Sequence, residues 1–359
     1  MFALSLHPKT RCMKDNLQQL VTQIKSLPAS DFQKLLDILL REDHSAPQSI
    51  EDFVSELKSA QVYTCPYCGS THIVRNGHRP DGVQKFRCKD CHRSFVPMTN
   101  TIFANTHKPL TAWQDYIKCV MSKETVKDSA ASCGLTVKTS FFWRHKILSG
   151  LLGMEENVVI DGISEGDETY FTLSFKGNAK SFKEGVPNRK QHKRGGEVHT
   201  RGLSKELVCV PCVVSRDHRS IAHPACLGGC SFEALNNVLG GKVQKGSYLC
   251  TDANSIYCKF AKENELNLVQ IKGGKETRGT FHIQHLNSYH SMLKKFIEKF
   301  NGVATKYLDG YLAWHNFLNY AKEGIADKTR ILKEWMVKCG KNFTRESIFT
   351  MPSLPFACR

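Results

Sequence analysis

Two pairs of closely spaced cysteines constrain the fold of this chain more than any other feature. Cys65 and Cys68 enclose two residues, Cys88 and Cys91 do the same, and 19 residues separate the pairs. Thiolates at this spacing are typical of a zinc ribbon, in which one tetrahedral zinc ion joins the tips of two hairpins. Because four protein ligands leave no open position, we expect one structural zinc ion per chain, within a ribbon over residues 61–100.

The stretch between the two pairs is basic. Phe86 and Phe95 are the apolar residues expected to pack inside so small a module. The intervening cations can lie along a phosphate backbone, or they can belong to a solvated face; they are Arg75, His78, Arg79, Lys85 and Arg87.

The whole chain is strongly basic. Its 359 residues are 41% hydrophobic, as in an ordinary globular protein with room for two or three domains. The net charge of +16 and the pI of about 9.2 favour a polyanionic partner, nucleic acid before membrane. No membrane span or secretory leader is apparent, so the fifteen cysteines are expected to be reduced thiols, some of them bound to metal.

Two helical regions flank the ribbon. Residues 1–60 have apolar side chains at helical spacing and predict a helical appendage that serves self-association or packing. Residues 105–155 predict a helix-turn-helix unit with its turn at Cys133-Gly134. Its second helix would enter the major groove of DNA, with a plain helical hairpin as the alternative; the basic side chains on this helix are Lys138, Arg144, His145 and Lys146.

From residue 158 onward the pattern predicts a mixed sheet with flanking helices, over residues 158–320, followed by a helical tail at 321–359. Apolar runs predict strands at 166–175, 206–214, 246–253 and 266–272, and helices at 231–239, 255–265 and 283–300. The chain is therefore expected to be a multidomain α+β or α/β protein. A basic, glycine-rich segment, residues 176–205, is expected to be an exposed loop that orders on nucleic acid; its DNA-binding candidates are Arg189, Lys193, Arg194 and Arg201.

Two acidic residues fall among these apolar strands. Asp167 lies near the expected start of the first strand, and Asp252 ends the strand that begins at residue 246. A carboxylate in a central strand is costly unless it is paired or bound to metal. Acids on adjacent strands can converge on one ion, although Asp252 taken alone can also be a helix cap.

The ordered set of motifs resembles one family. The chain carries a zinc ribbon, a helix-turn-helix, GDETYF, a basic loop, TDAN, H-x2-H-x-N-x2-H and GVATKYLDGYLAW, in that order. Over roughly residues 15–320 it is similar to the DDE-type transposases of bacterial insertion sequences, which have an RNase H-like catalytic core. The resemblance implies that Asp167 and Asp252 bind Mg²⁺ or Mn²⁺ and that the enzyme cuts transposon ends and joins them to target DNA. It also implies a homo-oligomeric active complex and association with the bacterial nucleoid, while the missing secretory leader and membrane span predict a cytoplasmic protein.

The third acid of that family is missing here. A glutamate is typical some 35 residues after the second acid, whereas Asn287 stands 35 residues after Asp252 and Lys294 follows 7 residues later. His290 shares a helix face with both. Asn287 offers a hard oxygen that suits Mg²⁺ and His290 an imidazole that favours Mn²⁺, so either can be the third ligand. Lys294 is expected to contact DNA phosphate.

The expected chemistry is in-line displacement at phosphorus with two metal ions, one activating the nucleophile and one stabilising the leaving oxygen. Two other functions stay open: a DNA-binding regulator with an inactive RNase H-like domain, and a metal-dependent nuclease or resolvase. His282 and His285 are expected either to begin the helix or to have a chemical role.

A second group of cysteines is expected to consist of buried thiols rather than a metal site. Residues three apart on a strand face opposite sides, which separates Cys209 from Cys212, and the spacing of the later pair, Cys226 and Cys230, is atypical.

Overall fold

The computed structural model describes residues 64–80, 83–106, 108, 110–177, 202–272, 277–319, 324–338 and 343–356. All of them belong to one compact unit, residues 54–359, so the division into five domains stays a prediction. The helical appendage expected at 1–60 lies outside the described residues, as do most of the basic segment and its four DNA-binding candidates; these are Arg189, Lys193, Arg194 and Arg201.

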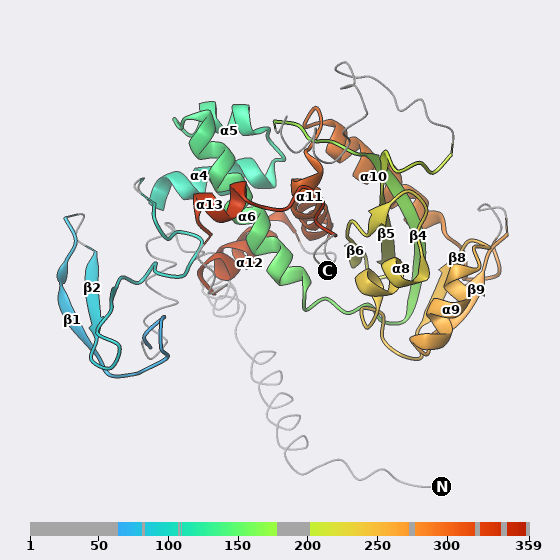
Figure 1. Ribbon diagram of the computed structural model, residues 1–359, viewed down its shortest axis with the longest axis horizontal. Helices are drawn as coiled ribbons and strands as arrows, with labels where there is room; N and C mark the ends of the chain where they lie inside the picture. The colour runs from blue at the N-terminus through green and yellow to red at the C-terminus, as the bar shows by residue number, and fades with distance from the viewer. Residues whose placement is uncertain are drawn as a thin grey trace, which may run out of the picture. The chain divides into compact units, whose positions relative to one another are not determined.

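The ribbon is a small antiparallel sheet. Its strands are β1 (Ile73–His78), β2 (Gln84–Cys88) and β3 (Ser94–Phe95), in that order across the sheet. Figure 1 shows β1 and β2 side by side. Phe86 and Phe95 stack with ring centroids 5.7 Å apart, as the sequence predicted. Since little else apolar is buried there, the cysteines form a large share of this core.

Three helices follow: α4 (Leu110–Met121), α5 (Val126–Ser132) and α6 (Val137–Glu155). The hydroxyls of Thr125 and Thr136 accept hydrogen bonds from Asp128 N–H (3.3 Å) and Thr139 N–H (3.2 Å) and so begin α5 and α6. Gly134, at φ +59°, makes the turn between them in a conformation that favours glycine. The predicted helices and turn are confirmed, while their contact with DNA stays a prediction.

The prediction that Arg144 and Lys146 face DNA is wrong. Both side chains are buried, because α6 packs against α11 (Thr305–Leu318) and α12 (Ile325–Lys338). Arg144 donates to the Glu124 carbonyl (2.8 Å) and lies over the ring of Trp314 (4.5 Å). Lys146 donates to the Ala104 carbonyl (2.6 Å).

A mixed sheet forms the centre of the remaining chain. Its strand order is β6-β5-β4-β8-β9, with β7 pairing on β5. β4 is antiparallel to β5 and parallel to β8, and β8 is parallel to β9. The mixed sheet predicted from the sequence is confirmed; its strands are β4 (Ile163–Thr172), β5 (Leu207–Ser215), β6 (Ser220–Ala222), β7 (Cys226–Leu227), β8 (Tyr248–Thr251) and β9 (Asn267–Gln270).

Helices cover both faces of the sheet. The helices α8 (Phe232–Leu239) and α9 (Ile256–Glu263) share one apolar core with β5 and β8. Helix α10 (Gln284–Glu298) packs on β4 and β5, and a short α13 (Arg345–Phe349) packs on α6. The three predicted helices of this region are thus confirmed. Among the described residues, no helix is long and apolar enough to cross a bilayer.

Side chains of β4 alternate between the two helical layers. A Cβ at Gly166 would lie 3.2 Å from Leu249 and 3.6 Å from Tyr257 of α9, so even-numbered positions face α8 and α9. Glu165 instead contacts the first turn of α10. By the same alternation Asp167 faces α10, the helix that carries the predicted third ligand.

Candidate active site

The two predicted acids are neighbours across the centre of the sheet. The parallel pairing of β4 and β8 ends with Gly166 opposite Thr251, and the next residues are Asp167 and Asp252. Adjacent strands lie about 4.8 Å apart, so the two aspartate side chains start from neighbouring backbone positions. Asp167 lies in the middle of β4 rather than near its start, because the strand already begins at Ile163.

The surroundings of Asp167 disfavour its charged form. Burial raises the pKa of its carboxyl from 3.8 to about 6, and the nearby charge of Asp252 acts in the same direction. The Glu168 N–H, which donates to Asp167 Oδ1 (2.8 Å), and the charge of Lys294 partly oppose this shift. A buried carboxyl group whose charged form is disfavoured in this way is typical of a site that binds a cation.

Glu168 lies on the other face of β4. The Tyr257 hydroxyl donates to its Oε1 (2.8 Å), and burial raises its pKa to about 7. Glu168 follows Asp167 directly in the GDETYF motif, and this position was the sequence signal that could have identified it as a further acid near the site.

Helix α10 presents its two candidate ligands differently. The Asn287 side chain is exposed. His290 is half-buried, and its Nε2 is buried with no hydrogen-bond partner among the described residues. Burial and the charge of Lys294 lower the pKa of His290 to about 4, so its imidazole is neutral at pH 7. A neutral, buried and unpartnered ring nitrogen can coordinate a metal ion.

Lys294 connects α10 electrostatically to the acids. Its side chain is exposed, and its charge acts both on Asp167 and on His290. These charge effects place Lys294 near Asp167 and near His290. The ligand atoms of Asp167, Asp252 and His290, however, are not among the described groups that meet within 4.8 Å.

A buried ion pair attaches the start of α10 to β4. Glu165, only 1% exposed, lies 3.0 Å from Arg216 Nη2 and 2.9 Å from His285 Nδ1, and it accepts the Leu286 N–H (3.0 Å). His282 Nδ1 lies 3.4 Å from the same carboxylate. These contacts attach the first turn of α10 to Glu165, which lies two residues before Asp167 in β4. The ligand atoms of Glu165, His282 and His285 also lie within 4.8 Å of one another, a separation at which they can share a metal ion. Sequence reasoning missed Glu165 and Arg216.

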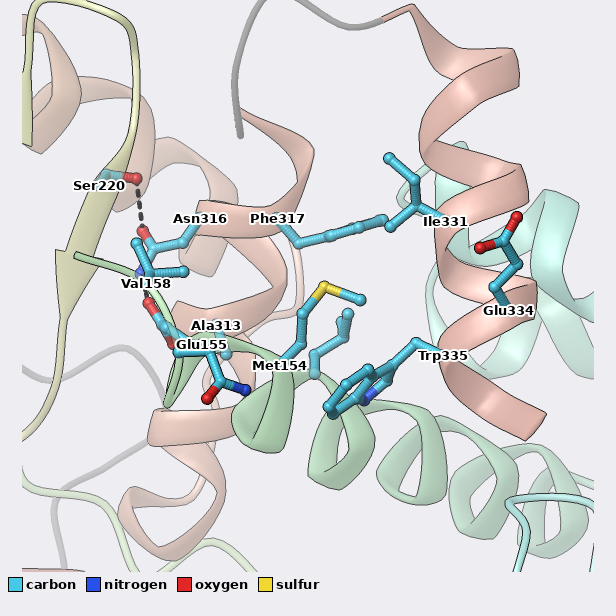
Figure 2. A pocket seen from close by; sticks show the side chains of 12 residues that line it. Met154, Glu155, Val158, Ser220, Ala313, Asn316, Phe317, Ile331, Glu334 and Trp335 are labelled. Carbon is cyan, nitrogen blue, oxygen red and sulfur yellow. Dashed lines mark hydrogen bonds between the residues drawn. The ribbon is translucent and has the colours of Figure 1, made fainter. Parts of the chain in front are cut away.

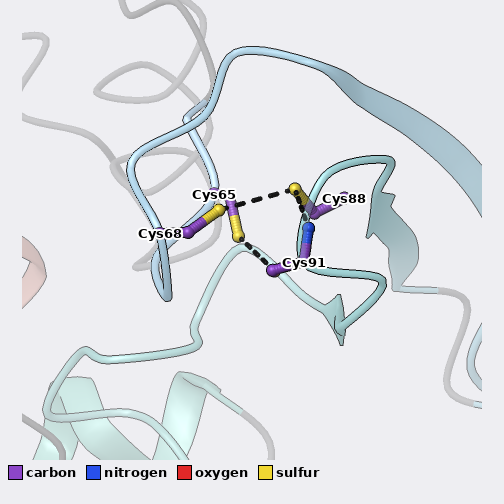
Figure 3. Close-up of side chains that lie close together, drawn as sticks. All are labelled: Cys65, Cys68, Cys88 and Cys91. Carbon is purple, nitrogen blue, oxygen red and sulfur yellow. Dashed lines mark hydrogen bonds between the residues drawn. The ribbon is translucent and has the colours of Figure 1, made fainter.

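The four ribbon cysteines converge (Figure 3). Cys65 Sγ lies 3.5 Å from Cys91 Sγ and Cys68 Sγ lies 3.6 Å from Cys88 Sγ. All four sulfur atoms lie within 4.8 Å of one another. Tetrahedral zinc with bonds of about 2.3 Å separates its sulfur ligands by about 3.8 Å, so this donor set fits a structural zinc ion.

A pocket of about 450 Å³ lies elsewhere, between α6, α11 and α12 (Figure 2). The side chains of Met154, Phe317 and Trp335 line it. Ser220 and Asn316 also line it, and Ser220 Oγ donates to Asn316 Oδ1 (3.1 Å). None of the predicted catalytic residues lines this pocket.

Comparisons with known proteins agree with the motif order. Residues 159–318 match the ISXO2-like transposase domain, and residues 59–92 match the InsA N-terminal domain. An uncharacterized protein in transposable element ISH50 of Halobacterium salinarum is 22% identical over 278 residues, which are 73% of this chain and 90% of that protein. Insertion element iso-IS1N protein InsA of Shigella dysenteriae is 52% identical over 31 residues, which are 9% of this chain and 34% of that protein.

Two solved structures are also similar. A pre-cleavage Mos1 transpososome aligns with 67% of this chain and 82% of its own, at 11% identity and a TM-score of 0.20. The Mos1 mariner paired end complex with Mn has the same coverage, with 12% identity and a TM-score of 0.21.

Proposed function

We propose that this chain, which combines an InsA-type ribbon with an ISXO2-like transposase domain, is the DNA transposase of an insertion sequence. It binds the ends of the element, cleaves them and transfers the freed strands to target DNA. The observation that carries the proposal is the pairing of β4 and β8, which sets Asp167 and Asp252 side by side within the matched domain.

Asp167, Asp252 and His290 are the proposed ligands of the catalytic metal. The raised pKa of Asp167 and the unpartnered Nε2 of His290 support this set, and the exposure of Asn287 counts against that residue. When bound, Mg²⁺ or Mn²⁺ supplies Lewis-acid polarisation of phosphoryl oxygens. The resemblance to the transposase family implies two such ions. An imidazole ligand favours Mn²⁺.

The remaining side chains of this region hold and orient DNA. Lys294 is the proposed contact to the phosphate next to the scissile bond, because its ammonium lies on the side of the acids and is free to reach solvent. Glu165 and Arg216 keep α10 at a fixed register against β4, which sets the position of His290.

Binding of the element's ends is assigned to the ribbon and the helical unit. Arg75, His78 and Arg87 are exposed on β1 and β2, and Lys138 is exposed in the first turn of α6. The N-terminal residues of a recognition helix are those that reach base edges, so Lys138 replaces Arg144 and Lys146 in this role. We also propose that the basic residues of segment 176–205 bind DNA. The active complex is proposed to be a homo-oligomer, and the protein to associate with the nucleoid.

The test uses the full chain and DNA that carries the terminal inverted repeats of its own element. Asp167→Asn and Asp252→Asn should abolish cleavage and strand transfer in Mg²⁺ and in Mn²⁺, with end binding in a gel-shift assay kept within about threefold. Glu263→Gln, which changes an exposed carboxylate on α9 outside the parts assigned to DNA, is the control and should retain full activity.

The same assay separates the other functions. A wild-type protein that binds the ends and never nicks them is a regulator. A protein that cuts without joining is a nuclease, and retained cleavage by Asp167→Asn removes the assignment of the acids.

A further inference from the structure

Three cysteines meet on the face of the sheet that is covered by α8 and α9. Cys209 lies on β5, Cys226 lies on β7, and Cys230 directly precedes Ser231, the residue that caps the N-terminus of α8. Their sulfur atoms all lie within 4.8 Å of one another. These three residues are called the β7 thiol cluster below. Sequence reasoning expected separate buried thiols here.

The backbone explains why these three thiols meet and why Cys212 does not join them. Cys209 and Cys226 are paired across β5 and β7. Gly228, at φ +78°, reverses the chain so that Cys230 returns toward the same point. Cys212 is paired with Asp167 and so faces α10, on the opposite side of the sheet. The alternation of side chains along β5 therefore separates Cys209 from Cys212, as the sequence predicted. It does not separate Cys209 from Cys226 and Cys230.

The cluster has the chemistry of a soft-metal site. Cys209 is fully buried, and Cys226 and Cys230 are half-buried. Several thiolates can coexist at such separations only when a cation neutralises them.

We propose that Cys209, Cys226 and Cys230 bind a second zinc ion, with three thiolates from the protein and a fourth position left for water or another ligand. Each cysteine that binds loses its thiol proton to solvent, so up to three protons are released. The ion joins β5 and β7 to the start of α8. Because the cluster and Asp167 lie on opposite faces of the sheet, this site is separate from the proposed active site and does not depend on transposition.

The ribbon supplies an internal comparison. Its four thiols satisfy the same distance condition as the β7 thiol cluster. Zinc is therefore expected at two places in the chain, with the closed ribbon site holding its ion more tightly than a site of three thiolates.

The experiment measures zinc per chain in the purified full-length protein after it is loaded with Zn²⁺ and freed of excess metal. The wild type should contain two zinc ions. Cys226→Ser and Cys230→Ser should each contain one, and Cys258→Ser, which changes an exposed thiol on α9, should still contain two. Cys68→Ser should lose the other ion.

A second measurement keeps the test independent of folding defects in the variants. The wild type is titrated with a chelator while zinc release, proton uptake and thiol reactivity are followed together. Two steps are expected, the first exposing the thiols of Cys226 and Cys230, located by alkylation and mass spectrometry. A wild type that contains one zinc ion per chain, and in which Cys226 and Cys230 react before any chelator is added, overturns the proposal. A disulfide within the cluster, detected as a loss of two hydrogens by intact mass, overturns it as well.

Discussion

Replacing Glu165 by glutamine tests how α10 is held against the sheet. The substitution keeps the shape of the side chain and an oxygen for the Leu286 N–H, but it leaves Arg216 without its counter-charge. Removing one partner of a buried ion pair costs about 3–5 kcal/mol. Arg216 is 27% exposed and keeps its bond to the Thr280 carbonyl (3.0 Å), so we expect about 2–3 kcal/mol.

The assay is thermal unfolding of the metal-free protein, followed by circular dichroism. In a unit of this size, a loss of about 2–3 kcal/mol should lower Tm by roughly 3–5 °C. Glu263→Gln, which breaks an exposed pair with Lys259 on α9, should change the stability by less than about 0.5 kcal/mol. In a double-mutant cycle with Arg216→Met, the coupling energy should exceed about 1 kcal/mol. A Glu165→Gln protein that melts within about 1 °C of the wild type would refute the idea that this ion pair holds α10.

Three further predictions concern the acids, the third ligand and the buried cations. Because burial raises the pKa of Asp167 from 3.8 to about 6, the folded state binds its proton more tightly than the unfolded state, and the metal-free protein should lose stability as pH rises from about 4 to 6. Asp167→Asn should therefore stabilise the metal-free protein by about 1–3 kcal/mol at pH 7 and not at pH 4; equal effects at both pH values in denaturant titrations would argue against the shift. His290→Ala should lower the cleavage rate more than about 100-fold and Asn287→Ala less than about 10-fold, and His290→Asn should shift the preference from Mn²⁺ toward Mg²⁺; the opposite ranking of the two alanine variants assigns the third ligand to Asn287. Arg144→Met should cost about 1–3 kcal/mol of stability with no change in the DNA affinity of the folded protein. Lys138→Met should instead weaken DNA binding at unchanged stability. Weaker DNA binding by folded Arg144→Met would restore the prediction that Arg144 contacts DNA.

Much of the sheet could be predicted because its strands are apolar and regularly spaced. The apolar run ahead of Asp252 fixed the end of β8, and the run after Asp167 placed that acid in a strand. What the sequence could not supply was the register of β4 against β8, since pairing between residues more than 80 positions apart leaves no local signal.

Burial of polar side chains was the main source of error. A lysine or arginine on a helix predicts solvent or DNA, and only the packing of α6 against Trp314 shows that Arg144 is internal. Likewise, Glu165 reads as one more acid in a strand until the folded chain brings Arg216 and His285 to it. The β7 thiol cluster depends on the chain reversal at Gly228, which spacing alone does not reveal.

The proposed ligands place the catalytic metal between β4, the end of β8 and α10, and metal-directed cleavage of the backbone locates it. Fe²⁺ is substituted into the full chain, ascorbate and peroxide are added, and the fragments are mapped by mass spectrometry, with Mg²⁺ and Mn²⁺ as competitors. Cuts are predicted in β4 around Asp167, directly after β8 at Asp252, and in α10 around His290, all suppressed by Mn²⁺ and absent from Asp252→Asn. Cuts that spare these three segments, or that persist in Asp252→Asn, would contradict the account.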